Sequence, residues 1–294
     1  MTGERLGAEQ AQPPNLLDAR RVPQVDLVFE VDPGGRTLLR RRRAAYPFHV
    51  GRSWHVPGDP EGMLTLYLQS CSGGVFQQDA LGARLRAKAG AHVHVSTAAS
   101  TVVHTMEHGD AVQTVEIDAE AGSLVEYLPD PLILFPRARL KNLLRVRAHP
   151  ESSIMLWDAV IAHDPAGKGR VFDWLLSDLA VRDSDGRLLA RDRYRLEGEA
   201  FQRAQPGAMH GYACQGSFLV LQQAVPQGQV ADALRSALPT DPAIYAGATR
   251  LAADCGAWVR VLARDAVGLG EALKCAWYAA RTILTGQEPA QRRK

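Results

Sequence analysis

The sequence has few cysteines, and none of them forms a close pair. Cys71, Cys214, Cys255 and Cys275 are widely separated and make no CxxC motif. This spacing argues against a zinc knuckle and against a disulfide framework. A protein of a reducing compartment fits this pattern.

Long apolar runs are also absent. A membrane-spanning helix needs about 18 or more consecutive apolar residues, and the sequence has no such run. Residues 1–15 are polar and lack the apolar centre of a signal peptide. We therefore expect a cytoplasmic protein without a membrane partner, with a flexible leader at residues 1–20 and a single β-rich domain at 21–294.

Charge of one sign does not dominate, because the sequence has 34 basic and 32 acidic residues and a net charge of +2. No global field therefore recruits nucleic acid. The basic run Arg40–Arg43 could bind phosphate, but its composition favours an exposed edge strand or turn protected by charge.

Catalytic motifs are missing as well. The glycine spacings of a Rossmann fold or a P-loop, the GxSxG nucleophile motif and the HExxH metal motif do not occur. The acidic residues Asp79, Asp130, Asp158 and Asp173 form no pair with a recognisable catalytic spacing. The residues alone thus predict a protein that is not an enzyme.

Short runs of β-forming residues fill the first two-thirds of the chain, and Gly, Asp or Pro mostly separate them. The clearest runs are Val25–Val31, Met63–Leu68, His92–Val95, Val112–Ile117 and Ser123–Leu128. The turn residues Asp32–Gly35 predict a hairpin before Leu38 and Leu39. This pattern favours a sandwich, a barrel or a β-solenoid, and no exact repeat distinguishes them.

The last third contains helical spacing. Apolar residues predict one helix at Val230–Leu238, which ends before Pro239, and a second at Gly270–Leu284, with Gly286 as its C-cap. A strand is expected between them at Trp258–Leu262. The prediction is a mainly β protein with a few helices near the C-terminus.

Histidines offer one metal hypothesis. His92 and His94 lie two apart in a predicted strand, so both imidazoles project from one face and could share a metal such as nickel, with His104 and His108 as further ligands. The alternative is that His92 and His94 occupy the exposed positions of a half-buried strand, with Val93 and Val95 inside.

The segments Tyr127–Phe135, with its two prolines, and Ser72–Asp79, with its Gly-Gly pair, are the most distinctive in the chain. Both resemble motifs of the UreD (UreH) family of urease accessory proteins. Tyr127–Phe135 is similar to the family's "YLPdPxIpF" signature, and Ser72–Asp79 resembles its Gly-Gly and Gly-Asp element, with Gly73 and Gly74 kept and Gln78 in place of the second element's glycine. The prolines at 129 and 131 fix φ and remove hydrogen-bond donors, so the chain should leave its sheet around Asp130.

Further matches follow in the family's order. They are Thr97 within Val95–Thr101, the pair Trp157–Asp158, the pair Gly169–Arg170, Tyr245 and Gly247 within Ile244–Thr249, and the closing helix with Trp277, Arg281 and Gly286. Together the matches span roughly residues 25 to 290.

The resemblance implies two layers of helically wound β-strands, a β-solenoid-like scaffold, and a role in loading nickel into apo-urease. It implies UreF, UreG and the urease apoprotein as partners, a possible homodimer of the complex, and nickel passing through an internal tunnel without a tightly bound cofactor. By motif position, Asp79, Thr101 and Asp158 are the nickel-path candidates. Trp277, Tyr278 and Arg281 are the candidates for a partner interface.

One alternative keeps the fold without the metal role. Gln78, Ala98 in place of a glutamine and the missing Gly-Glu element suggest a divergent β-rich protein-binding module.

Overall fold

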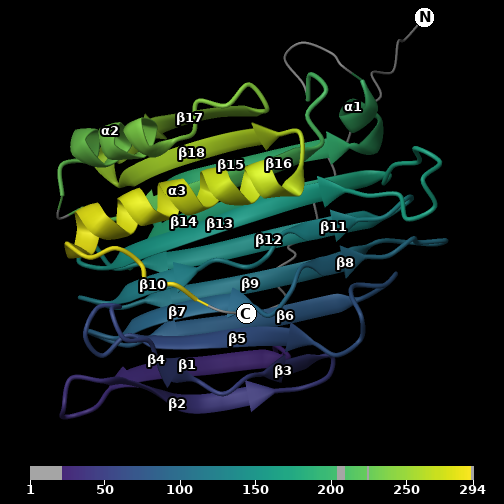
Figure 1. Cartoon of the computed structure of the whole chain (residues 1–294). Helices are drawn as coiled ribbons and strands as arrows, with labels where there is room; N and C mark the ends of the chain where they lie inside the picture. Colours follow the sequence, from purple (N-terminus) through teal and green to yellow (C-terminus); the bar gives the residue numbers. More distant parts are fainter. Residues whose placement is uncertain (1–21, 204–208, 224, 293–294) are drawn as a thin grey trace, which may run out of the picture.

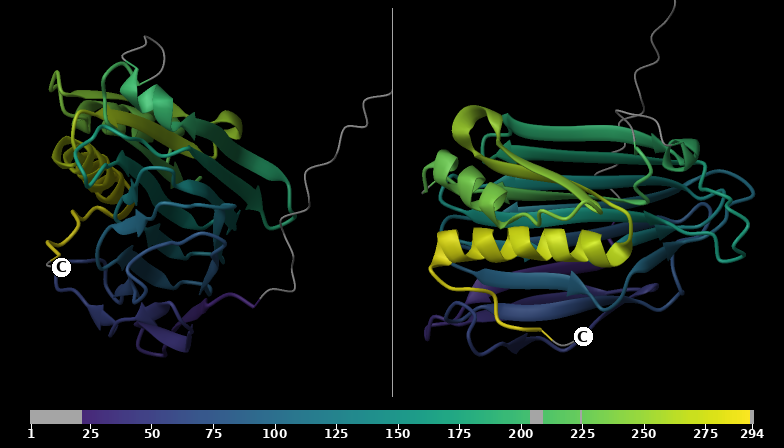
Figure 2. Two further views of the ribbon diagram at one scale, coloured as in Figure 1. Left: turned by 90° about the vertical axis from the view of Figure 1, so that its right-hand side faces the viewer. Right: turned by 45° about the horizontal axis from the view of Figure 1, so that its top comes forward.

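Two β-sheets stacked face to face form the body of the protein (Figures 1 and 2). The computed structural model describes residues 22–203, 209–223 and 225–292. The leader expected at residues 1–20 lies outside these residues.

Sheet A has seven strands. In order across the sheet they are β15 (Leu188–Glu197), β14 (Trp174–Asp183), β12 (Arg139–Ala148), β9 (Ala111–Ala119), β6 (Ala80–Ala87), β1 (Val25–Val31) and β2 (Thr37–Ala44). The hairpin predicted at residues 32–35 is confirmed, because β1 and β2 pair antiparallel. The Arg40–Arg43 run lies on the edge strand β2 and is exposed, as expected.

Sheet B has eleven strands. Its main path is β17 (Ile244–Arg250), β18 (Gly256–Ala263), β16 (Cys214–Leu221), β13 (Ser153–Ala162), β10 (Leu124–Tyr127), β7 (His92–Thr97), β5 (Leu64–Ser70) and β3 (Phe48–Val50). The short strands β4 (Trp54–His55), β8 (Thr101–Val103) and β11 (Leu132–Leu134) pair beside this path.

From β5 to β14 the chain passes back and forth between the two sheets. Within each sheet the strands laid down by successive turns pair in parallel: β5, β7, β10 and β13 in sheet B, and β6, β9, β12 and β14 in sheet A. This winding makes the protein a two-layer, β-solenoid-like scaffold, as expected from the family resemblance.

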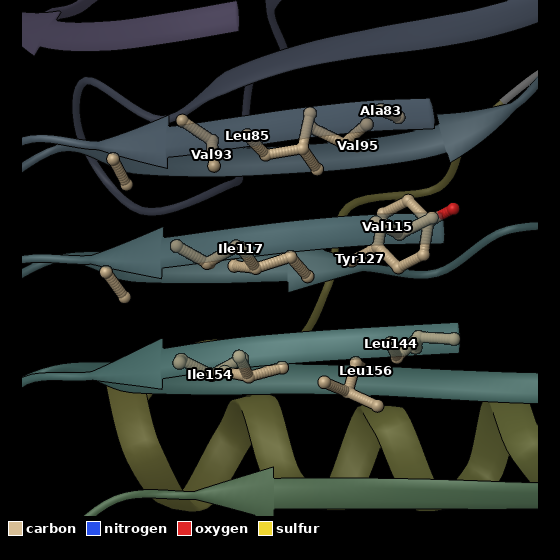
Figure 3. Packing of buried hydrophobic residues seen from close by; sticks show 14 of the residues in the cluster. Ala83, Leu85, Val93, Val95, Val115, Ile117, Tyr127, Leu144, Ile154 and Leu156 are labelled. Carbon is tan, nitrogen blue, oxygen red and sulfur yellow. The ribbon is translucent and has the colours of Figure 1, made fainter. Parts of the chain in front are cut away.

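The main core lies between the sheets, where alternate residues of each strand point inward. Figure 3 shows Val93 and Val95 of β7 close to Leu85 of β6, and Tyr127 of β10 beside Val115 of β9 in the next turn. Burying one such aliphatic side chain contributes about 1.5–3 kcal/mol. The alternation read from the sequence thus places the inward faces correctly.

Helices cover part of the outer face of sheet B (Figure 1). They are α2 (Gln227–Ala237) and α3 (Ala266–Thr285), with the short α1 (Gly198–Gln202) and the 3-10 turn Ala252–Asp254 elsewhere. Helix α3 begins one turn earlier than predicted because the Asp265 side chain accepts a hydrogen bond from Gly268 N, and it ends at Gly286 with φ of 72°. Within the described residues no helix is long and apolar enough to span a membrane.

Candidate functional site

Sheet B is interrupted at the segment with two prolines. Strand β10 ends at Tyr127 and β11 begins only at Leu132, so the chain leaves the sheet at Pro129 and Pro131 as predicted. The excursion is held by two hydrogen bonds: Asp130 N donates to Thr97 Oγ1 over 2.7 Å, and the indole of Trp157 donates to Pro129 O over 2.6 Å.

A cavity of about 480 Å³ lies between the sheets at this interruption. Nine of the residues named in the family motifs line it, although they are spread over 86 positions of the sequence. They are Gly73, Gly74, Thr97, Thr101, Tyr127, Pro129, Asp130, Trp157 and Asp158. The motif positions therefore share one place in the fold.

Within the described part of the chain, Asp158 is one of two carboxylates on the wall of the cavity, and Asp130 is the other. Asp158 lies on β13, whose inward face looks toward sheet A, where Ser177 Oγ and Tyr194 OH donate hydrogen bonds to Asp158 Oδ2 over 3.0 and 3.1 Å. Burial raises the pKa of Asp158 above its ordinary value, and burial beside this carboxylate raises the pKa of Tyr194. Asp158 is thus a carboxylate with weakened acidity held in place by two neutral donors.

The opposite wall of the cavity is polar as well. Gln113 of β9 donates its side-chain amide to Asn142 of β12 over 3.3 Å, and both residues line the cavity from sheet A. Thr101 contributes from β8. Sheet A thus contributes the side-chain amides of Gln113 and Asn142 to the cavity wall, and Thr101 contributes a hydroxyl from the same sheet as Asp158.

Asp79 lies elsewhere. Its carboxylate accepts a hydrogen bond from Phe76 N over 2.8 Å and closes the turn that leads into β6, and it lines a second hollow on the outer face of sheet A. Gln78 in this turn has φ of 64°, a left-handed conformation that glycine adopts with less strain. The nickel-path candidates thus divide, with Thr101 and Asp158 at the cavity and Asp79 outside it.

Gly73 and Gly74 differ in how tightly the fold needs them. Gly74 has φ of 145°, and a Cβ added there would lie 2.2 Å from Val102 O. A Cβ at Gly73 meets nothing within 4 Å. Gly74 is therefore the position where the backbones approach too closely for any side chain.

His94 is buried, contrary to the expectation that it occupies an exposed strand position, because the Trp277 ring of helix α3 packs over it, with 5.5 Å between the ring centroids. Its Nδ1 lies 2.6 Å from Glu126 Oε2, and burial lowers the pKa of His94. His92 is half-buried on the same strand, whereas the ring of His104 stacks on Phe76. Among the described residues no group of three or more His, Cys, Asp and Glu could hold a metal ion.

Glu126 is the centre of a buried ionic network. Arg281 donates to both of its oxygens, each over 2.6 Å, and the indole of Trp277 donates over 2.8 Å. Burial alone would raise the pKa of Glu126, but the hydrogen bonds from His94 and Arg281 lower it to about 2. Arg281 also contacts Asp59 over 3.2 Å.

This network changes the interpretation of the C-terminal helix. Trp277 and Arg281 were expected at a partner interface, but their side chains are inside the protein, packed against sheet B. Tyr278 is half-buried and packs beside Trp277. Of the three candidates, only Tyr278 remains open to a partner.

The remaining motif residues lie at the surface. Arg170 pairs with Asp164 over 3.0 Å in the loop after β13, next to Gly169 with φ of 68°. Tyr245 is exposed on the edge strand β17, two residues before Gly247. None of these four residues lines the cavity.

Two residues of the site were not predicted. Glu126 lies in a strand whose four residues are all buried. A carboxylate within this apolar run was the sequence feature that could have indicated a buried ion pair. Tyr194 lies in the polar alternating strand β15 and has no distinguishing local pattern.

Comparison with known proteins agrees with these motifs. The sequence model of the family described as "UreD urease accessory protein" matches residues 22–294. The chain is 42% identical to "Urease accessory protein UreD 1" of Pseudomonas syringae pv. tomato, over 95% of this chain and 98% of that protein. It is 36% identical to the protein of the same name from Methylorubrum extorquens (97% and 95% covered) and 34% identical to "Urease accessory protein UreD 2" of Streptomyces griseus (93% and 94% covered).

Proposed function

The chain belongs to the UreD family of urease accessory proteins, and from this premise we propose that it is a non-catalytic scaffold that helps to deliver nickel to apo-urease. In this proposal nickel is cargo, and it passes through the cavity between the two sheets. The protein acts in the cytoplasm.

The observation that carries this proposal is the position of Asp158. Its carboxylate lies on the wall of a cavity of about 480 Å³, and two neutral hydroxyl donors fix its orientation. A carboxylate with hydroxyl and amide oxygens nearby can bind nickel, but it binds this borderline cation weakly, because such oxygen ligands suit harder cations better.

The surroundings of Asp158 also favour release of the cation. A cation that must move on needs several weak sites rather than one tight site. The raised pKa of Asp158 means that a proton competes with the metal for its oxygens more strongly than at an ordinary carboxylate. Asp158 and Thr101 therefore serve as consecutive weak contacts, whereas Asp79 holds a turn.

The proposed partners are UreF, the GTPase UreG and apo-urease. The sequence contains no P-loop, which agrees with GTP hydrolysis belonging to UreG. We expect the chain to join UreF and UreG in one complex, with two copies of that complex forming a homodimer.

Co-expression with UreF, UreG and urease from the same source tests this function. The expected results are a complex that can be isolated and urease that contains nickel only when the chain is present. If folded chain and folded UreF do not associate, the scaffold role fails.

Gln78 favours a second candidate, a binding module that has lost nickel transfer, because a strained residue stands where the family usually has glycine. The two functions separate in a strain that lacks its own UreD. Restored urease activity supports nickel delivery, and association with UreF without restored activity supports the module.

A further inference from the structure

The outer face of sheet A carries rows of arginines that cross its strands. Paired residues place one row in the order Arg43, Asp26, Arg84, Glu116, Arg145, Ala180 and Arg191. The next row is Arg41, Val28, Arg86, Asp118, Arg147 and Arg182. We call the eight arginines of these two rows the arginine ladder.

Two nearly buried carboxylates lie beneath the ladder, and each is shared by two arginines. Asp26 is 2.7 Å from Arg86 and 3.3 Å from Arg41. The carboxylate Asp178, next to the first row, is 3.2 Å from Arg145 and 3.0 Å from Arg191. Because one carboxylate neutralises one guanidinium, each trio presents a positive charge to solvent.

The surplus of charge is local. The eight arginines of the ladder have four carboxylates among or beside them, namely Asp26, Glu116, Asp118 and Asp178, so the ladder keeps about four positive charges, whereas the whole chain carries +2. The Arg147 and Arg41 side chains are 66% and 55% exposed. A charged partner can therefore reach the ladder directly.

The face is hollowed. A hollow of about 1260 Å³ has Arg84, Arg86, Arg145, Arg147 and Arg182 among its lining residues. Exposed aromatic rings of Tyr46 and Phe76 also line it. Arginine together with exposed aromatic side chains is typical of protein interfaces.

We propose that the arginine ladder docks an acidic face of a folded partner protein. Glu116 and Asp118 lie in the middle of the two rows, where they would repel the phosphates of a nucleic acid strand. A protein partner can place basic residues opposite these two carboxylates and acidic residues opposite the arginines. This docking does not depend on nickel transfer.

Binding of a labelled oligoglutamate peptide to the full chain tests the ladder. We expect binding at low salt that weakens as salt is added. The charge-reversing double change Arg147→Glu and Arg182→Glu should weaken peptide binding about tenfold. The neutralising double change Arg147→Gln and Arg182→Gln should weaken binding less, and it introduces no new carboxylate that could repel its neighbours in sheet A.

The matched control is Arg250→Glu with Arg264→Glu, which makes the same change of charge at exposed positions in and beside sheet B. This pair should bind oligoglutamate as the unchanged chain does. The proposal is overturned by absent binding, by equal loss in the control pair, or by tighter binding of a DNA oligonucleotide with the same number of charges. Neither urease nor nickel is present, so failure here leaves the function in urease maturation untouched.

Discussion

Arg281 and Glu126 form a two-point ion pair inside the protein, although 155 residues separate them in the sequence. Both side chains have no exposed surface. The pair joins the C-terminal helix to the centre of sheet B and brings the family's tryptophan and arginine positions, Trp277 and Arg281, onto one carboxylate. This contact gives those two motif residues a structural role.

Replacing Arg281 by methionine should destabilise the protein strongly. The change leaves the buried Glu126 carboxylate without its main cation, and breaking a buried pair in this way costs about 3–5 kcal/mol. Urea unfolding measures the loss. Arg235→Met, which breaks a surface pair with Asp232, should cost less than about 1 kcal/mol. Equal effects of the two changes would contradict a structural role for Arg281.

The free energy of unfolding should decrease in two steps as the pH is lowered. The pKa of His94 is lowered from 6.5 by burial, so below that pH the unfolded chain binds a proton that the folded chain resists. The pKa of Glu126 falls from 4.5 to about 2 on folding, so its contribution of about 3 kcal/mol is present above pH 4.5 and is lost toward pH 2.

Unfolding by urea at a series of pH values measures this dependence. The Glu126→Gln variant serves as control, because it should lose the step below pH 4.5. A wild-type step of the same size in that variant would show that other carboxyl groups cause it.

Gly74→Ala should be far more damaging than Gly73→Ala. The new Cβ at position 74 would overlap Val102 O, which accepts a hydrogen bond from Val75 N, so we expect a loss of about 3 kcal/mol. Position 73 has a left-handed φ but open space, and alanine there should cost about 1–2 kcal/mol. Thermal unfolding of both variants measures the two losses. A Gly74→Ala variant as stable as the Gly73→Ala variant would show that the backbones at Gly74 and Val102 do not approach as closely as described.

Tyr194→Phe should weaken nickel delivery without unfolding the protein. The change removes one of two hydroxyl donors to Asp158, which costs about 1 kcal/mol and raises the pKa of that carboxyl further. Nickel in urease matured with this variant should fall. Tyr245→Phe, an exposed position away from the cavity, should leave the nickel content unchanged.

Local features of the fold could be predicted from sequence because local chemistry fixes them. Strand β1 occupies the predicted residues 25–31, since alternation and the following turn residues define both ends. The break after Tyr127 follows from the fixed φ of Pro129 and Pro131.

Long-range features could not be predicted in the same way. Parallel pairing of β12 with β14 needs a crossover through the other sheet, and no residue near either strand specifies it. The pattern around His94 gives the side to which its ring points, but only the fold places helix α3 over that side. The hydrogen bond from Tyr194 in sheet A to Asp158 in sheet B likewise depends on how the two sheets stack, which no local pattern specifies.

The nickel content of urease matured with Asp158→Asn, compared with Asp79→Asn, tests the central claim most directly. Both changes remove one carboxylate charge with little change of shape, but only Asp158 lines the cavity between the sheets. The account predicts that Asp158→Asn lowers the nickel content several-fold while Asp79→Asn leaves it close to that of the unchanged chain. Full nickel loading with Asp158→Asn, in a variant that folds and still binds UreF, would contradict the route through the cavity.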